Sequence, residues 1–154
     1  MELHPDFRDL LAEFARFEVS FAVLGGYAVG HHGRPRATKD LDLLVSGAGD
    51  NLRRVGEALR AFGAPPSVIA AVESLGPTEV AFLGVPPVRV DILRTVDGVE
   101  TEAVLARAVS VQVDGLSIPI MHLEDLIANK LAAGRPQDLA DAEALERIRS
   151  DTRS

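Results

Sequence analysis

The sequence lacks several features that would place it in a common functional class. It contains no cysteine, which excludes disulfide bonds, thiolate catalysis and cysteine–zinc sites. No apolar run approaches the ~20 residues that a membrane-spanning helix needs. The N-terminal stretch 1–16 is too charged for a signal peptide. We therefore expect a cytoplasmic protein that does not associate with membranes.

Positive charge is scarce as well. The chain has 16 lysine and arginine residues against 23 aspartate and glutamate residues, a net charge of -7. Proteins that grip duplex DNA normally carry clustered basic residues, so no duplex DNA footprint is expected. A single RNA end held by a local basic patch remains open. A length of 154 residues suits one domain with a buried core, and we expect a single domain over 1–154.

The sequence contains one distinctive pattern. An apolar run enters a Gly25-Gly26 turn, which is followed by a small-residue segment and a basic loop over 34–39. The pattern closes with Asp40-Leu41-Asp42-Leu43-Leu44-Val45. Strand side chains alternate, so Asp40 and Asp42 share one face while Leu41, Leu43 and Val45 point to the opposite face, into a core. About 4 Å apart, two such charges repel by roughly 4 kcal/mol at an effective dielectric constant of about 20. A basic side chain or a bound cation must offset this, and hard oxygen ligands suit Mg²⁺ or Mn²⁺.

These residues carry a resemblance to a known family. The Gly-Gly turn, the spacer, the Arg-x-Thr-x-Asp-x-Asp motif ending at Asp42 and the apolar tail resemble the nucleotidyltransferase superfamily of the DNA polymerase β type. The form is most similar to small bacterial nucleotidyltransferases related to abortive-infection and toxin–antitoxin proteins. The resemblance covers 19–45, Asp91 and the segment after Leu123. The alternative interpretation is an aspartate pair on a solvated strand face beside an ordinary glycine turn.

Alternation and turn residues predict an α+β fold, a mixed sheet of about five strands with helices packed mainly on one face and the acids on the open face. The expected strands are 20–24, 40–45, 79–83, 88–93 and the hairpin 109–113 with 116–120, in which Pro119 suggests an edge strand. The expected helices are 3–17, 26–32, 52–62 after Asp50 as N-cap, 68–75 after Ser67, 99–108, 123–133 and one from Pro136 to about Arg149.

Asp91 is the third candidate acid. In the strand 88–93 the apolar residues share one face, and Arg89 and Asp91 share the other. The resemblance implies that Asp91 arrives beside Asp40 and Asp42, so that all three are catalytic and metal-binding. The residues of this strand alone favour the alternative, a salt bridge from Asp91 to Arg89 or to a neighbour on a solvated face.

The nucleotide-binding candidates lie in the turn and the basic loop. The backbone N–H groups of Gly25 and Gly26 can receive phosphates, although a tight turn with positive φ explains the glycines too. The resemblance implies that Arg36 could neutralise departing pyrophosphate, and Thr38 could cap or turn the loop through its hydroxyl. The pair His31-His32 lacks further ligands at suitable spacing, so we expect no metal role there.

Lys130 falls on the apolar stripe of its helix, where a lysine either snorkels or points into a polar cavity. Its segment resembles the lysine-rich motif that closes the active site of related small nucleotidyltransferases, which implies that Lys130 reaches a triphosphate or the acid cluster. The leading interpretation of Asp138 and Asp141 is pairing with Lys130 or Arg135 that locks the two C-terminal helices together.

The function expected is metal-dependent transfer of an NMP group from an NTP such as ATP to a hydroxyl of a protein, an RNA end or a small molecule. Two metal ions would clamp the attacking and leaving oxygens. Longer relatives carry a further helical domain, so acceptor binding here would need a homodimer, a protein partner or a small acceptor. The alternatives are a toxin–antitoxin-type partner-binding module and a nucleotide sensor without transfer activity.

Overall fold

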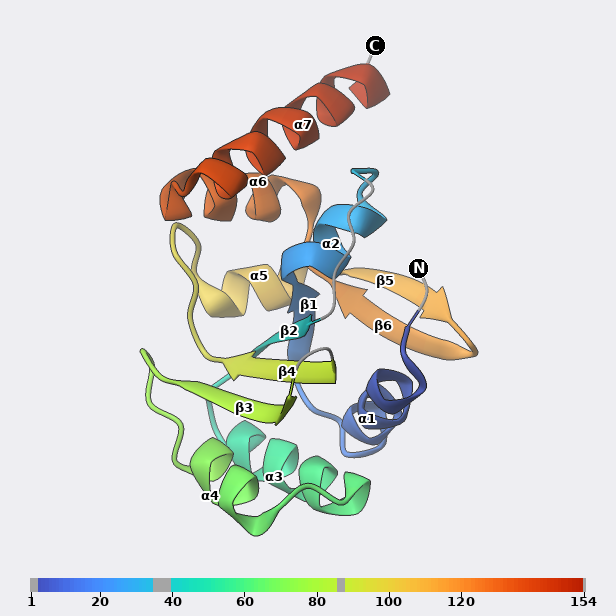
Figure 1. The fold of residues 1–154 in the computed structure, drawn as a ribbon, viewed down its shortest axis with the longest axis vertical. Coiled ribbons are helices and arrows are strands. Elements are labelled where there is room, and N and C mark those ends of the chain that lie inside the picture. Colours follow the sequence, from blue (N-terminus) through green and yellow to red (C-terminus); the bar gives the residue numbers. More distant parts are fainter. Residues whose placement is uncertain (1–2, 35–39, 86–87, 154) are drawn as a thin grey trace.

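Figure 1 shows the fold in a computed structural model that describes residues 3–34, 40–85 and 88–153. The strands in this part of the chain are β1 (Phe21–Leu24), β2 (Asp40–Val45), β3 (Val80–Val85), β4 (Val88–Leu93), β5 (Val109–Val113) and β6 (Leu116–Ile120). The helices are α1 (Pro5–Arg16), α2 (Gly25–His31), α3 (Asn51–Phe62), α4 (Pro66–Glu73), α5 (Thr101–Arg107), α6 (Leu123–Ala133) and α7 (Pro136–Arg153).

The strands form one mixed sheet in the order β3-β4-β2-β1-β6-β5. Strands β2 and β4 run parallel, as do β1 and β6, and the other neighbours are antiparallel. The expected α+β fold with a mixed sheet is confirmed. The sheet has six strands rather than about five, and the expected hairpin β5–β6 joins it where Ile120 pairs with Val23.

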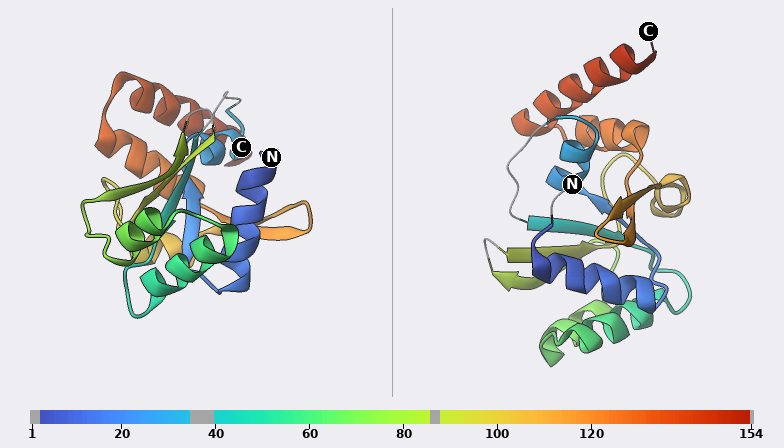
Figure 2. Two further views of the ribbon diagram at one scale, coloured as in Figure 1. Left: turned by 60° about the horizontal axis from the view of Figure 1, so that its bottom comes forward. Right: turned by 90° about the vertical axis from the view of Figure 1, so that its right-hand side faces the viewer.

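Helices lie on both sides of the sheet. In Figure 1 α1, α3 and α4 gather below the strands, whereas α2, α5, α6 and α7 lie above them, and the right-hand view of Figure 2 agrees. The face with the greater share of the core bears Leu41, Leu43 and Ile92, which are fully buried. The opposite face is more covered than expected, since Leu44 of that face is fully buried as well.

Three local expectations need correction. Pro119 does not mark an edge: β6 lies between β5 and β1, and its pairing with β1 is at Ile120, beyond the proline. Asp50 precedes α3, but its carboxylate pairs with Arg53 and Arg54 instead of capping the helix backbone. Helix α4 begins at Pro66, so Ser67 lies inside its first turn.

In the described residues, every helix is too short or too polar to cross a membrane.

Candidate active site

The register between β2 and β4 brings the predicted acids together. Asp42 lies opposite Asp91, and Asp40 lies opposite Arg89, on adjacent parallel strands. Register partners point to the same face of a sheet, so the three carboxylates and the guanidinium group share one face. The expectation that Asp91 reaches the side of the sheet that carries Asp40 and Asp42 is met.

Arg89 is the counter-ion of this cluster. Its Nε and Nη2 atoms donate to the Asp91 carboxylate at 2.9 and 3.2 Å, and Nη2 lies 3.5 Å from Oδ2 of Asp40. The Phe82 ring lies beneath the guanidinium, with Cζ 5.0 Å from the ring centroid, a cation–π contact that holds the arginine in place. The salt bridge foreseen as the alternative for Asp91 therefore exists, and it lies within the acid cluster.

Asp42 is the carboxylate that Arg89 compensates least. Burial, followed by the negative charges of Asp91 and Asp40, raises the pKa of Asp42 to about 6, against smaller opposing effects of Lys130 and Arg89. Desolvation and like charges both disfavour the ionised form. At neutral pH this group is a half-buried anion beside two other carboxylates, which is the electrostatic setting that favours binding of a cation.

Gly25 packs directly against Asp42. Its φ is +67°, and a Cβ at this position would lie 2.1 Å from Oδ2 of Asp42. The glycine is therefore required twice, by the left-handed backbone and by the close approach of the carboxylate. The turn brings the start of α2 to the acid cluster.

A cleft of about 510 Å³ opens above the acids. Its wall brings together the candidates Gly25, Gly26, Asp42, Asp91 and Lys130, which come from four elements. This volume is within the ~300–1,000 Å³ range of small-molecule sites. The remaining lining residues are Leu24, Leu93, Thr95, Val96, Asp97, Asn129, Ala133, Arg135 and Asp138.

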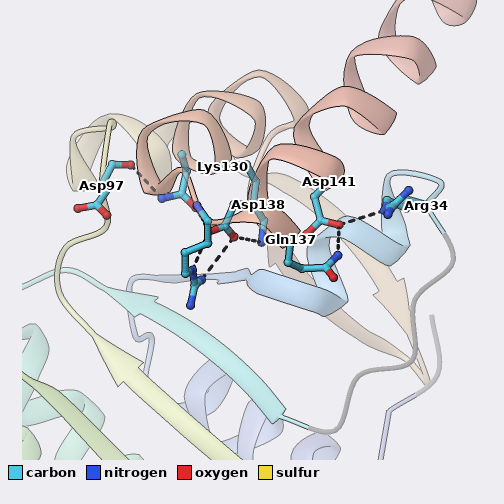
Figure 3. A network of polar contacts seen from close by, with 8 residues as sticks. Arg34, Asp97, Lys130, Gln137, Asp138 and Asp141 are labelled. Atoms are coloured by element: carbon cyan, nitrogen blue, oxygen red, sulfur yellow. Dashed lines mark hydrogen bonds and ion pairs between the residues drawn. The ribbon is translucent and has the colours of Figure 1, made fainter.

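Lys130 is held by the C-terminal helix. Its Nζ lies 3.3 Å from both Asp138 and Asp141, and all three side chains are buried. Figure 3 shows Lys130 pointing from α6 toward these acids of α7. Arg135 also binds Asp138 at 2.7 Å, and its hydrogen bond lowers the pKa of that carboxyl group. The predicted lock between the two helices is confirmed, and the lysine still reaches the cleft wall.

Of the basic loop 34–39, the structure describes Arg34. Arg36 and Thr38, together with Lys39, fall outside the described residues. Arg34 donates through Nε to Asp141 at 3.0 Å, as Figure 3 shows, so this loop residue is engaged with α7. Nε2 of His32 lies 2.7 Å from the Met121 carbonyl oxygen, and burial lowers the pKa of His32.

The acid cluster supplies carboxylate oxygens, the ligand type that divalent cations such as Mg²⁺ take. Within the described ranges, no three or more histidine, aspartate or glutamate side chains converge closely enough to hold a metal ion. Asp42 and Asp91 nevertheless supply carboxylate oxygens at the cleft wall, with Asp40 adjacent and Arg89 supplying the positive charge. Carboxylate oxygens are the ligand type that Mg²⁺ and Mn²⁺ prefer, and Arg89 contacts the oxygens of Asp91 and Asp40 that such a cation would use.

The sequence interpretation missed Phe82 and the polar residues that line the cleft beside α6. Thr95 and Asp97 lie beyond the end of β4, and Asn129 donates to the Asp97 carbonyl oxygen at 2.9 Å. Alternation along β3 was a usable signal for Phe82, because it places this residue on the face opposite Ala81 and Leu83. No local pattern pointed to the contact between Asn129 and Asp97.

Solved structures with a similar fold were found. A nucleotidyltransferase candidate from Thermotoga maritima is 14% identical, with a TM-score of 0.61 over 97% of this chain and 96% of that one. The lincosamide antibiotic adenylyltransferase LnuA, solved with lincomycin, is 15% identical, with a TM-score of 0.60 over 95% and 98%. ANT(2″)-Ia, solved with adenylyl-2″-tobramycin, is 14% identical, with a TM-score of 0.53 over 96% and 94%.

At these identities the structural likeness shows the fold. A search of curated protein sequences found no match. The family described as "Nucleotidyl transferase AbiEii toxin, Type IV TA system" matches residues 9–154, nearly the whole chain. The chain therefore belongs to the AbiEii family of nucleotidyltransferase toxins.

Proposed function

We propose that this nucleotidyltransferase moves an NMP group from an NTP to an acceptor hydroxyl with the help of Mg²⁺ or Mn²⁺ held by Asp40, Asp42 and Asp91. The observation that carries the proposal is the pairing of Asp42 with Asp91 at the wall of a cleft that also contains Gly25, Gly26 and Lys130. Two of the similar structures are adenylyl-transferring proteins, which favours ATP as the donor.

The triphosphate would lie in this cleft. The backbone N–H groups of Gly25 and Gly26 would receive its β- and γ-phosphates, and Lys130, which lines the same cleft, would add positive charge. Arg36 and Thr38 would complete the phosphate contacts from the basic loop. Bound divalent cations would neutralise the charge that develops on the phosphoryl oxygens.

The proposed reaction is a nucleophilic substitution at the α-phosphorus of the NTP. The acceptor oxygen forms a bond to this atom while the bond to the bridging oxygen of the β-phosphate breaks, and pyrophosphate leaves. The hydroxyl proton passes to the carboxylate of Asp91. Asp42 holds its negative charge near the reacting phosphoryl group, where its desolvation makes binding of a cation more favourable.

The toxin–antitoxin family supports a protein partner, which we take to be an antitoxin. Such a partner can act as the acceptor or can block the site. A homodimer and an RNA end are further candidates for completing the acceptor side.

Labelled-nucleotide transfer into a whole-cell lysate tests the proposal. The purified protein is incubated with each of ATP, CTP, GTP and UTP radiolabelled at the α-phosphate, with Mg²⁺, and the lysate is separated into protein, RNA and small molecules. We expect one class to take label, and Asp42→Ala to reduce labelling at least about a hundredfold. Nucleotide binding without transfer would instead indicate a sensor, and a stoichiometric partner captured without nucleotide dependence would indicate a binding module.

A further inference from the structure

Two buried carboxylates of α7 lie beside the cleft, and the proposed transfer step uses neither of them. Asp138 is 2% exposed and Asp141 is 0% exposed, although an ionised side chain is costly to bury unless a cation pairs with it. Asp138 is bound by Arg135, whose Nε atom donates to it at 2.7 Å, and it lines the cleft. Asp141 does not line the cleft. It therefore lies behind the groups that a ligand would meet.

Asp141 contacts two cations that come from different parts of the chain. Its Oδ2 atom lies 3.3 Å from Nζ of Lys130 in α6, and its Oδ1 atom accepts from Nε of Arg34 at 3.0 Å. Gln137, one turn earlier on α7, also donates to Oδ1 at 3.0 Å, as Figure 3 shows. One carboxylate thus joins the first residue of the basic loop 34–39 to the lysine of the cleft wall.

Asp141 also connects the helices on which the cleft depends. The glycine turn lines the cleft at the beginning of α2, and Lys130 lines it from α6. Arg34 follows the end of α2, and Gly33 beside it packs against α7, since a Cβ at Gly33 would lie 3.4 Å from Cδ1 of Ile148. Helix α7 therefore holds the end of α2 next to α6, and Asp141 is the charged group in that contact.

Lys130 lies between the two acids with one donor to spare. Its ammonium group has three N–H donors, and Asp138 and Asp141 both lie 3.3 Å from the nitrogen. A charge-assisted contact to one well-placed acceptor is shorter, about 2.7–2.9 Å. The equal and longer distances indicate a nitrogen held between two carboxylates. The third donor therefore remains for a phosphate oxygen in the cleft, whose wall contains Lys130.

We propose that Asp141 is a positioning residue for nucleotidyl transfer, which fixes the ammonium group of Lys130 at the triphosphate and ties it to the end of α2 through Arg34. This inference rests on the proposed function and adds to its site a residue that touches no substrate. Asp138 is less suited to this role, because it lines the cleft and is bound by Arg135. Asp141 acts from behind the lysine, so it holds Lys130 without meeting the phosphates.

The charge of Asp141 acts in the opposite direction to its positioning effect. As an anion it weakens binding of a polyanionic nucleotide, so a variant that removed the charge would mix a loss of position with a loss of repulsion. Asp141→Glu avoids this problem, because it keeps the charge and moves the carboxylate by one methylene group. A displacement of about 1 Å in a positioning group can cost about a hundredfold in rate.

The full chain is titrated with ATP and with AMP in the presence of Mg²⁺. Asp141→Glu should lower the affinity for ATP at least about tenfold and leave the affinity for AMP within about twofold, because AMP lacks the β- and γ-phosphates. Asp125→Glu is the matched control. Asp125 is a buried acid of α6 that binds Arg107 at 2.7 Å, and neither residue lines the cleft. The control should leave the affinity for both nucleotides unchanged.

The lysine can also be observed directly. The sequence contains two lysines, Lys39 and Lys130, so protein with isotope-labelled lysine gives two side-chain signals in NMR spectra, and Lys39→Arg identifies them. Saturating ATP should shift the Lys130 signal in the unmodified protein and in Asp125→Glu, and should leave it in place in Asp141→Glu. A general loss of stability would not have this selective effect on one signal.

Gln137→Ala provides the test if Asp141→Glu does not fold. Gln137 is exposed and uncharged, and its side chain donates to Asp141, so the substitution changes neither the net charge nor a buried acid. Loss of one donor that orients Asp141 should lower the affinity for ATP about threefold and leave that for AMP unchanged. Urea unfolding confirms that the variant is folded.

The positioning role and the proposed function fail in different ways. Equal losses for ATP and AMP, an ATP affinity that both Asp141→Glu and Gln137→Ala leave unchanged, or an equal loss in Asp125→Glu would overturn the positioning role while transfer by the unmodified protein still stood. If the unmodified protein bound no NTP, or bound ATP and labelled no acceptor, the proposed function would be contradicted, and the positioning role with it.

Discussion

Asp42 of β2 and Asp91 of β4 lie opposite each other on adjacent parallel strands, so two carboxylates share the wall of one cleft. Their proximity destabilises the ionised form of Asp42, whose pKa rises to about 6. Arg89 binds Asp91 and approaches Asp40, and it compensates Asp42 less. A cluster in which neighbouring carboxylates destabilise one another's ionised form is typical of a functional site rather than of a fold-stabilising network.

Asp42→Asn should stabilise the folded protein at neutral pH. Because the folded state binds the Asp42 proton more tightly than the unfolded chain, this group lowers the free energy of unfolding as pH rises from 3.8 to about 6. A shift of this size corresponds to about 3 kcal/mol, which the amide substitution should recover. Urea unfolding across this window measures the difference between the two proteins.

Asp138 serves as an internal control in the comparison of the Asp42→Asn variant with the unmodified protein. The lowered pKa of Asp138 acts with the opposite sign, since its contribution is present above the unfolded pKa and is lost as pH falls. This group is common to both proteins and cancels in their difference. A difference that does not grow between pH 3.8 and about 6 would contradict the assigned environment of Asp42.

Arg89→Gln should strengthen binding of Mn²⁺ to the protein without nucleotide. The arginine occupies Asp91 and Asp40, so a cation must compete with it for the same oxygens. We expect affinity to rise at least about tenfold, measured by electron paramagnetic resonance of free Mn²⁺. Arg107→Gln is the matched control, because Arg107 binds Asp125 at 2.7 Å between α5 and α6. Equal or weaker Mn²⁺ binding by Arg89→Gln would show that the arginine does not compete.

Lys130→Met should destabilise the contact between α6 and α7. The substitution leaves Asp138 and Asp141 buried with Arg135, Arg34 and Gln137 as remaining partners. We expect a loss of about 2–3 kcal/mol in the free energy of unfolding, because a buried charge loses a charged partner.

The control for Lys130 is a surface ion pair on the partner helix α7. Arg147→Met breaks an ion pair with Glu143 in which both side chains are 71% exposed, so its cost should be below about 1 kcal/mol. Similar losses for the two variants, measured by chemical denaturation, would refute a stabilising role of the buried network.

Gly25→Ala should damage both folding and nucleotide binding. Alanine at φ +67° is strained, and its Cβ would lie 2.1 Å from Asp42. Gly49→Ala is the matched control, since Gly49 has φ +57° and open space around its Cβ position. The control should cost about 1–2 kcal/mol from backbone strain, and Gly25→Ala should exceed it. ATP affinity by calorimetry should fall only for Gly25→Ala, and equal effects would exclude a specific contact with Asp42.

Several properties followed from the sequence alone because they are local. Strand alternation placed Asp40 and Asp42 on one face, and turn residues located the hairpin of β5 and β6. The spacing of Lys130, Asp138 and Asp141 on neighbouring helices indicated the lock that the structure contains. Periodicity is a consequence of backbone geometry, so a single chain segment reveals it.

Tertiary structure alone decided which strands became neighbours. The parallel register that puts Asp91 opposite Asp42, the binding of Arg89 to two acids and the position of β3 at the sheet edge all depend on contacts between distant segments. Pro119 illustrates the same dependence on distant contacts. Its strand lies inside the sheet because the hairpin pairs with β1. The residue types and their faces are therefore set along the chain, whereas the order of strands is set by how the whole apolar core is buried.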